Sequence, residues 1–399
     1  MSVRVAIVTE SFPPDVNGVA HSALRVAEHL VLRGHEPMVI APAPARLAPG
    51  DAGPFPCPVV RLRSLPMPGY RGFRIGLPGP DLRAAMTDHG TELVHLASPF
   101  VLGPAAIAAA SRGDLATVAV YQTDVPAYAR VYGMGRLGES AAWWRLRAIH
   151  NAAGRTLAPS TASALKLREH GVHRVWVWGR GVDTERFDPA RRSPGLRREL
   201  APGGEVLVGY VGRLAAEKRV DLLCQVAALP GVRLVVVGGG PAASALRQAL
   251  PGAVFLGPRH GTDLATIYAS LDVFVHSGAF ETFGQTLQEA AASGLPVVAP
   301  AAGGPLDIVG HGSTGYLVTP GEPDALADAV ARLVGDPHLR AAMGRAGRAR
   351  TLGRSWRTIG DQLIAHYQAV AGSSRRPALP GTPVLIPVPR SAARAGAPR

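Results

Sequence analysis

Two cations, Arg213 and Lys218, follow the apolar run 206–211 near the middle of the chain. A guanidinium can bind phosphate oxygens through two hydrogen bonds, and an ammonium acts as a compact point charge. Fixed positive charges at this spacing could neutralise the charge that grows on a departing diphosphate, with no metal or other cofactor. Lys166 and Lys218 are the only lysines among 42 basic residues, which favours a specific requirement at position 218. A solvated pair of loop cations is the simpler alternative.

Two glutamates, Glu281 and Glu289, follow the apolar run 273–276. If the stretch between them is helical, a rise of 1.5 Å per residue separates them by roughly 12 Å, which is about the distance from hexose to ribose in a nucleotide sugar. We therefore expect Glu281 to contact the sugar and Glu289 to accept hydrogen bonds from the ribose. A helix that begins near residue 282 would also aim backbone N–H groups at the sugar and phosphates. These N–H groups belong to Phe283, Gly284 and Gln285.

Gly18 lies at the end of a polar loop between the apolar run 3–8 and the helical pattern 19–33. Ligands of doubly wound domains bind at the carboxyl ends of the strands, and a glycine at a helix N-terminus lets an anion approach the backbone. We expect Gly18 to contact the donor or the acceptor. The loop lacks the G-x-G-x-x-G pattern of dinucleotide-binding proteins, and a plain turn is the alternative for Gly18.

The elements that must position these residues are short apolar runs that alternate with helical patterns. This alternation is typical of βαβ units with parallel sheets, and 399 residues exceed one hydrophobic core, so we predict an α/β protein with two Rossmann-like lobes and a cleft between them. The predicted strands are 3–8, 37–41, 59–62, 93–96, 117–121, 156–158, 206–211, 233–237, 254–256, 273–276, 296–299 and 315–318. The predicted helices include 19–33, 219–228, 262–270, 282–293 and 323–334.

The predicted lobes are residues 1–186, the acceptor-binding lobe, and residues 205–355, the nucleotide-sugar lobe. An Arg/Pro-rich linker, 187–204, separates them. Residues 372–399 contain five arginines and no acid in a Pro/Gly/Ala-rich stretch, which predicts a disordered basic tail.

Charge and cysteine content bound the partners and the compartment. Residues 1–186 carry 20 Lys and Arg against 14 Asp and Glu, whereas residues 205–355 carry 12 against 12. The basic first lobe suits an anionic membrane surface or an anionic acceptor, and a solubilising charge excess is the alternative. Nucleic acid is not expected, because no recognised binding module is present. Two distant cysteines, no signal-peptide pattern and no apolar run long enough for a bilayer predict a cytoplasmic protein.

Taken together, these motifs resemble glycosyltransferase family 4, which comprises retaining enzymes of the GT-B fold. The likeness covers residues 3 to about 370 and rests on the Gly18 loop, the run at 212–218 that contains Gly-Arg-Leu and Glu-Lys, the Glu281 and Glu289 pair, and Ala-Ser-Gly-Leu-Pro-Val-Val at 292–298. The segments Glu10-Ser11-Phe12, Tyr121-Gln122-Thr123-Asp124 and Arg180-Gly181-Val182-Asp183 look most like GDP-mannose-dependent α-mannosyltransferases of glycolipid synthesis in high-GC bacteria.

The resemblance implies transfer of a hexose, mannose from GDP-mannose, onto a lipid-linked acceptor at the inner face of the membrane. It also implies that a last helix, near 356–371, crosses back onto the first lobe. Many family members carry histidine near Gln122 or Asp124, and here Asp124 is the nearest ionisable group. The catalytic candidates are therefore Glu281 and Asp124, and the departing diphosphate could itself take the acceptor proton.

Two further functions stay open from the sequence. One is the same chemistry with a UDP-sugar, acting on diacylglycerol or a soluble acceptor. The other belongs to a different class, a sugar-nucleotide 2-epimerase of the same architecture or a binder without catalysis. The presence of Lys218 and Glu281 disfavours the binder.

Overall fold

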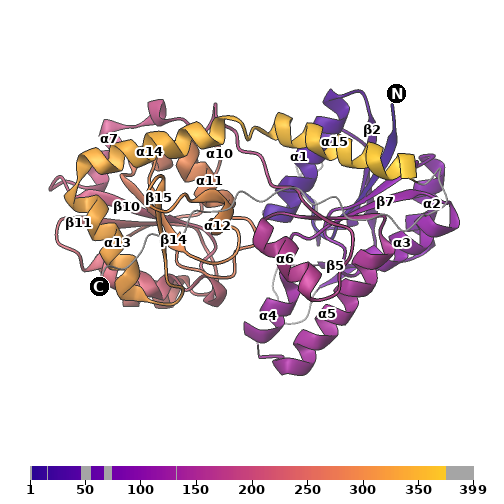
Figure 1. Cartoon of the computed structure of the whole chain (residues 1–399), viewed down its shortest axis with the longest axis horizontal. Helices are drawn as coiled ribbons and strands as arrows, with labels where there is room; N and C mark the ends of the chain where they lie inside the picture. The colour runs from indigo at the N-terminus through magenta and orange to yellow at the C-terminus, as the bar shows by residue number, and fades with distance from the viewer. Residues whose placement is uncertain (1, 16, 46–54, 67–73, 132, 374–399) are drawn as a thin grey trace, which may run out of the picture.

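A computed structural model describes residues 2–15, 17–45, 55–66, 74–131 and 133–373 of the chain. Figure 1 shows two lobes side by side, each built around its own sheet. This arrangement confirms the predicted α/β architecture of two Rossmann-like lobes. The predicted tail, 372–399, begins within the last helix, and its remainder lies outside the described residues.

Within the described residues, seven strands form the sheet of the first lobe, in the order β3-β2-β1-β6-β7-β8-β9. All neighbouring strands pair in parallel. The order reverses beside β1, and such a switch point is where doubly wound domains bind ligands. The strands are β1 (Arg4–Val8), β2 (Glu36–Pro42), β3 (Val59–Leu62), β6 (Leu93–Leu96), β7 (Ala116–Val120), β8 (Arg155–Ala158) and β9 (Val175–Val177).

Helices cover both faces of this sheet because alternate strand residues pack in opposite directions. In β1, Val5 and Ile7 join the cluster that includes α1 residues, whereas Ala6 and Val8 join the cluster with residues of α2 and α3. A small antiparallel hairpin, β4 (Ser64–Pro66) with β5 (Arg74–Gly76), lies outside the main sheet. The helices are α1 (Gly18–Leu32), α2 (Pro80–Asp88), α3 (Leu102–Arg112), α4 (Val125–Val131), α5 (Gly135–Ala152) and α6 (Thr161–Glu169).

The second lobe repeats the plan with six parallel strands in the described chain, in the order β12-β11-β10-β13-β14-β15. The strands are β10 (Val206–Val211), β11 (Val232–Val237), β12 (Val254–Gly257), β13 (Val273–Val275), β14 (Val297–Pro300) and β15 (Gly315–Val318). The helices are α8 (Cys224–Ala227), α9 (Ala243–Ala249), α10 (Gly261–Ser270), α11 (Gln285–Ala292), α12 (Pro305–Ile308), α13 (Pro323–Gly335) and α14 (Pro337–Leu352).

The segment after β10 differs from the helix predicted at 219–228. It consists of two 3-10 turns, η2 (Ala216–Lys218) and η3 (Val220–Leu223), followed by the single turn of α8. Arg219, between the two turns, has the left-handed backbone value φ 46°, which interrupts a continuous helix. The predicted helix was wrong here because a local backbone reversal overrode the apolar periodicity.

The segment 187–204, predicted as a linker, is folded onto the second lobe. It contains the 3-10 turn η1 (Pro189–Arg191) and the helix α7 (Pro194–Leu200), and Phe187 and Leu200 belong to the core of that lobe. Arg192 and Arg197 both donate to the carboxylate of Asp272, at 2.8 and 3.0 Å. The arginines that suggested an exposed linker therefore hold this segment against the second lobe.

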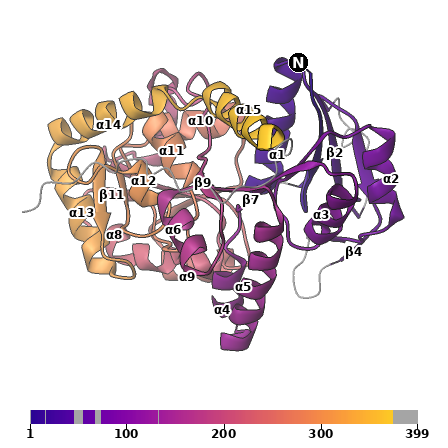
Figure 2. The same ribbon diagram turned by 45° about the vertical axis from the view of Figure 1, so that its right-hand side comes forward.

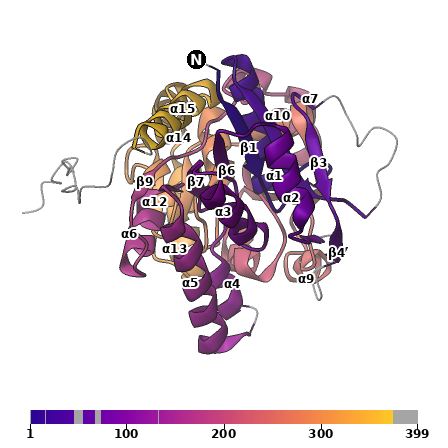
Figure 3. The same cartoon turned by 90° about the vertical axis from the view of Figure 1, so that its right-hand side faces the viewer.

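The last helix, α15 (Trp356–Ser373), returns to the first lobe and packs beside α1, as Figures 1 and 3 show. The Tyr367 hydroxyl lies 2.8 Å from Nδ1 of His95 on β6, and the indole N–H of Trp178 donates to the Ile359 carbonyl at 2.9 Å. The first lobe is thus completed by residues from the far end of the chain. Among the described residues, no helix is long and apolar enough to cross a membrane.

Candidate active site

The two lobes meet where the carboxyl ends of their strands face each other. The Thr282 hydroxyl, from the loop after β13, donates to the carbonyl of Gln122, which follows β7, at 3.1 Å. Gln288 of α11 donates through its amide to the Arg180 carbonyl at 2.9 Å, and Gln285 donates to the Gly181 carbonyl at 3.1 Å. These contacts fix the loops that carry the candidate site residues.

Lys218 and Glu281 form an ion pair at the head of the second lobe, with Nζ 2.7 Å from Oε2. Each side chain is less than a fifth exposed, at 17% and 18%. Burial opposes both charges, but the attraction between them prevails: it raises the pKa of Lys218 above its usual range, and together with His276 and Arg180 it lowers the pKa of Glu281 to about 2. Both groups are therefore fully charged at neutral pH.

The loops around this pair approach one another closely, and little or no room is left for a Cβ atom at positions 278 and 303. Ser277 donates from its hydroxyl to the Lys218 carbonyl at 2.8 Å, and a Cβ on Gly278 would lie 3.1 Å from the Lys218 Cα. A Cβ on Gly303 would lie 2.2 Å from the Glu281 carbonyl oxygen. The two glycines let the loops of 218, 278 and 281 lie against one another, so the ion pair has a fixed geometry.

Arg213 lies in the same loop as Lys218, five residues before it, and its side chain is 39% exposed. Its guanidinium is 3.9 Å from Glu217, whose side chain is 2% exposed, and its carbonyl accepts a hydrogen bond from the Tyr210 hydroxyl at 3.2 Å. A Cβ on Gly240 would lie 2.3 Å from the Leu214 carbonyl oxygen, so a glycine-rich turn supports the arginine loop from behind. The structure therefore places both predicted cations in one loop, at the carboxyl end of β10.

The loop before α11 corrects the predicted helix start. The helix begins at Gln285 rather than Thr282, because Gly284 has φ 99°, a left-handed conformation that favours glycine. The Gly284 N–H donates to Oε1 of Glu281 at 3.1 Å, so this group is used within the loop. Phe283, predicted beside it, is buried in the core with 3% exposure, which leaves only its backbone available to a ligand.

Glu289 lies within α11 and accepts a hydrogen bond from the Tyr268 hydroxyl at 3.3 Å. Burial raises the pKa of Glu289 to about 7, against the opposing effect of hydrogen bonds from Gln285 and Tyr268. Tyr268 itself packs against Phe274 and Phe187 in the core. Glu289 is thus held in place but only partly ionised at neutral pH.

On the first lobe, Gly18 begins α1, and the Asn17 side chain caps the helix by accepting from the N–H groups of Val19 and Ala20. The Gly18 carbonyl accepts a hydrogen bond from Nη1 of Arg180 at 3.1 Å, and Nη2 of Arg180 donates to Oε1 of Gln122 at 2.5 Å. Burial lowers the pKa of Arg180 to about 10, against the effect of Glu281. Gly18, Gln122 and Glu281 therefore surround one buried cation.

Arg180 and His276 are site residues for which the sequence analysis gave no role. His276 Nε2 lies 3.9 Å from Oε2 of Glu281, and its ring stacks on Tyr210 with centroids 6.2 Å apart. Burial lowers the pKa of His276 to about 4, so the ring is neutral at pH 7. The sequence signal for Arg180 was its place in a short segment that resembles the family, whereas His276 appeared only as the last residue of the predicted strand 273–276.

Asp124 is not brought to the Lys218 and Glu281 pair by any contact in the described chain. Its Oδ1 accepts the N–H of Ala127 at 3.1 Å at the start of α4, and its Oδ2 lies 2.5 Å from Nζ of Lys166 on α6. Both carboxylate oxygens thus have partners on the first lobe. A catalytic role for Asp124 stays a prediction.

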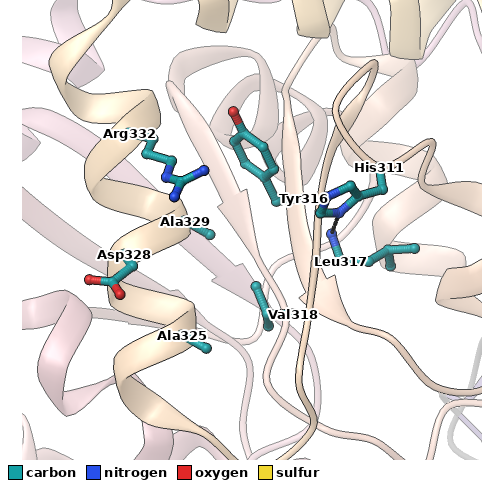
Figure 4. A pocket seen from close by; sticks show the side chains of 8 residues that line it. All are labelled: His311, Tyr316, Leu317, Val318, Ala325, Asp328, Ala329 and Arg332. Atoms are coloured by element: carbon teal, nitrogen blue, oxygen red, sulfur yellow. Dashed lines mark hydrogen bonds between the residues drawn. The ribbon is translucent and has the colours of Figure 1, made fainter. Parts of the chain in front are cut away.

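A pocket on the second lobe lies apart from this site. Figure 4 shows it at the edge of the second sheet, between Tyr316 and His311 on one side and Arg332 of α13 on the other, and none of the predicted site residues line it.

Within the described residues, no group of three or more His, Cys, Asp and Glu side chains could hold a metal ion.

Family comparisons cover both lobes. The model described as Glycosyltransferase Family 4 matches residues 16–186, and the model described as Glycosyl transferases group 1 matches residues 195–350. A GDP-mannose-dependent alpha-mannosyltransferase of Mycobacterium tuberculosis is 48% identical over 375 residues, covering 93% of this chain and 97% of that protein. One of Corynebacterium glutamicum is 42% identical over 94% of this chain and 91% of that protein.

Solved structures share the two-lobed fold at lower identity. A sucrose-phosphate synthase from Thermosynechococcus elongatus superposes with a TM-score of 0.80 at 22% identity, covering 93% of this chain and all of that chain. A HepE protein from Anabaena, in complex with UDP and glucose, gives a TM-score of 0.74 at 22% identity, over 92% of this chain and all of that chain. At this identity the likeness shows the fold alone.

Proposed function

The chain belongs to glycosyltransferase family 4, and from this premise we propose that it transfers mannose from GDP-mannose to a lipid-linked acceptor with retention of the α configuration. The near full-length relatives named GDP-mannose-dependent alpha-mannosyltransferase support the donor and the sugar. The single observation that carries the chemistry is the fixed Lys218 and Glu281 pair, at the point where the lobes meet and in the loop that also carries Arg213.

The donor diphosphate binds to Arg213 and Lys218 in this account. Lys218 already carries a full positive charge, and the exposed guanidinium of Arg213 can turn toward phosphate oxygens. As the bond between C1 of mannose and the β-phosphate oxygen breaks, these charges stabilise the negative charge that develops on GDP. Fixed cations can do this without a metal ion, which is part of the proposal.

Glu281 contacts the mannose hydroxyls. Its carboxylate is held from behind by the Gly284 N–H and by Lys218, and the remaining lone pairs can accept hydrogen bonds from the sugar. Glu289 accepts hydrogen bonds from the ribose hydroxyls, and it must be ionised to do so fully. The backbone N–H groups of Phe283 and Gln285, at the start of α11, complete the donor site.

The acceptor approaches from the first lobe, next to Gly18. Its hydroxyl oxygen forms a bond to C1 on the face from which GDP leaves, and the hydroxyl proton passes to the departing phosphate oxygen. Gln122 cannot take this proton, because an amide does not titrate at neutral pH and both its amide ends are bound, to Arg180 and to the Ala97 carbonyl. These reaction steps need no covalent intermediate between the sugar and the enzyme.

A lipid-linked acceptor places the reaction at the inner surface of the cell membrane, with the protein bound peripherally. The test is to incubate the purified protein with membrane lipids and radiolabelled GDP-mannose, then to determine the anomeric configuration of the labelled lipid by NMR. Label in an α-linked glycolipid supports the proposal. Labelling from UDP-glucose instead of GDP-mannose would assign the chain to the UDP-sugar alternative.

A further inference from the structure

A helical hairpin, made of α4 and α5, projects from the first lobe away from the rest of the molecule, as Figures 1, 2 and 3 show from three directions. The two helices pack against each other. The base of α5 is anchored by Trp143, which stacks on His170 with ring centroids 3.6 Å apart, and by Arg145, which donates to the Phe100 carbonyl at 3.0 and 3.1 Å. The hairpin is thus a rigidly rooted projection.

The outer side of this hairpin carries large apolar side chains that are exposed to solvent. Met134 precedes α5 and is 64% exposed, Leu137 in the first turn is 87% exposed, and Trp144 two turns later is 63% exposed. Spacings of three and seven residues place them on one side of a helix, together with the exposed Ala141 and Ala148. Side chains of this size are normally buried on a partner or a membrane when they share one stripe.

Arginines border this stripe along one edge. Arg136 and Arg147 are both exposed and lie eleven residues, or just over three turns, apart, so they share a row beside the apolar stripe. Arg130 of α4 is also exposed. The single acidic residue of α5, Glu139, falls on nearly the opposite side of the helix from Leu137 and is partly buried.

We infer that the stripe Met134, Leu137, Ala141, Trp144 and Ala148 docks this protein on an anionic lipid bilayer. An apolar stripe beside a row of arginines is what an interfacial helix needs, because the apolar side chains enter the acyl boundary while the cations stay among the phosphates. The exposed indole of Trp144 favours the same interface. This inference rests on the proposed function in one respect, the role of the docking surface, which is to hold the first lobe at the membrane that contains the acceptor.

The test is a vesicle co-flotation assay with the full chain, without donor. Wild-type protein is expected to bind vesicles of phosphatidylglycerol and phosphatidylcholine at least tenfold more strongly than vesicles of phosphatidylcholine alone. The double variant Leu137→Gln with Trp144→Gln should bind the anionic vesicles at least tenfold more weakly. The double variant Arg136→Gln with Arg147→Gln should lose the preference for anionic vesicles. In wild type, tryptophan emission should shift to the blue on binding, and this shift should be lost in Trp144→Phe.

Matched controls lie on the second lobe. Leu352→Gln removes an exposed leucine of α14, and Arg198→Gln with Arg345→Gln removes the same charge as the arginine pair above, so vesicle binding should be unchanged in both. Equal losses in the control and hairpin variants, or unchanged binding of the hairpin variants, would overturn the docking surface. Calorimetric titration of the same variants with GDP-mannose separates the two proposals, because the hairpin variants should bind the donor as wild type does.

Discussion

Nζ of Lys218 lies 2.7 Å from Oε2 of Glu281, although 63 positions separate the two residues in the chain. The charge proposed to neutralise the leaving diphosphate and the carboxylate proposed to contact the sugar are therefore parts of one pair. The ion pair keeps both groups ionised despite their burial, and an incoming donor finds them already oriented.

Replacing Lys218 should therefore remove activity. In Lys218→Met the leaving group loses a fixed cation, so kcat should fall by about 100- to 1000-fold, as for the loss of one charge-stabilising donor in an active site. Steady-state kinetics with GDP-mannose would measure the change. The matched control is Lys166→Met, which removes the other lysine and its ion pair with Asp124. Comparable losses of kcat in the two variants would mean that Lys218 has no special role.

Donor binding should depend on pH through Glu289. Burial raises the pKa of this carboxyl to about 7 in the free protein, whereas a bound ribose would stabilise its ionised form, so affinity should increase as the pH rises through about 7. Calorimetry at pH 6 in buffers of different ionisation enthalpy should detect proton release on binding, and none should remain at pH 9. In Glu289→Gln the pH dependence should vanish and binding should weaken by about 1 to 3 kcal/mol for the lost charged hydrogen bonds. Proton release that persists in this variant would assign the titration to another group.

The raised pKa of Glu289 also bears on stability. A carboxyl whose pKa is higher in the folded than in the unfolded protein favours folding at low pH, and this contribution is lost as the pH rises through about 7. Glu289→Gln should therefore raise the melting temperature relative to wild type at pH 8.5 but not at pH 5. Melting curves at the two pH values would show it, and a variant less stable than wild type at pH 8.5 would contradict this assignment.

Asp124 provides a test of how the acceptor loses its proton. Asp124→Asn keeps an oxygen for the N–H of Ala127 but cannot act as a base, so kcat should fall less than about tenfold if the diphosphate takes the proton, whereas loss of a general base costs about 100- to 10,000-fold. A loss in the higher range would make Asp124 the base. The melting temperature serves as the control, because weakening of the Lys166 pair affects stability alone.

Arg180 should act as a positioning residue that connects Gly18 and Gln122. Arg180→Met leaves two oxygens without their donor and should cost about 1 to 3 kcal/mol of stability, together with a loss of kcat at nearly unchanged donor affinity. Arg180→Lys keeps the charge but cannot reach both oxygens, so it should restore stability only in part. Arg345→Met, at an exposed site on α14, is the control. Full activity of Arg180→Met would exclude this role.

The sheets could be predicted from the sequence because strands buried on both faces are continuous apolar runs, as in Val5 to Val8 of β1. The three-residue strand β9 and the hairpin of β4 and β5 were missed, since such short runs carry little periodicity. The predicted start of the helix at 282 was wrong because Gly284 adopts a left-handed conformation that only the local packing requires.

The sequence predicted which residue types form the site, but it did not predict the contacts between them. Arg213, Lys218, Glu281 and Glu289 have the chemistry of a donor site, and the structure pairs Lys218 with Glu281 and keeps Arg213 in the loop of Lys218. Their partners depend on tertiary packing: Gly278 and Gly303 allow the backbone to approach Lys218 and Glu281 closely. Arg180 and His276 were not predicted, because their roles arise from burial between elements rather than from spacing in the sequence.

The most direct test is a calorimetric titration of GDP-mannose, UDP-glucose and UDP-GlcNAc into wild type, Arg213→Ala and Lys218→Ala. GDP-mannose should bind most tightly to wild type, and each substitution should weaken this binding by about 1 to 3 kcal/mol, the range for a hydrogen bond to a charged group. No measurable binding of any of the three donors, or unchanged GDP-mannose binding in both variants, would contradict this prediction.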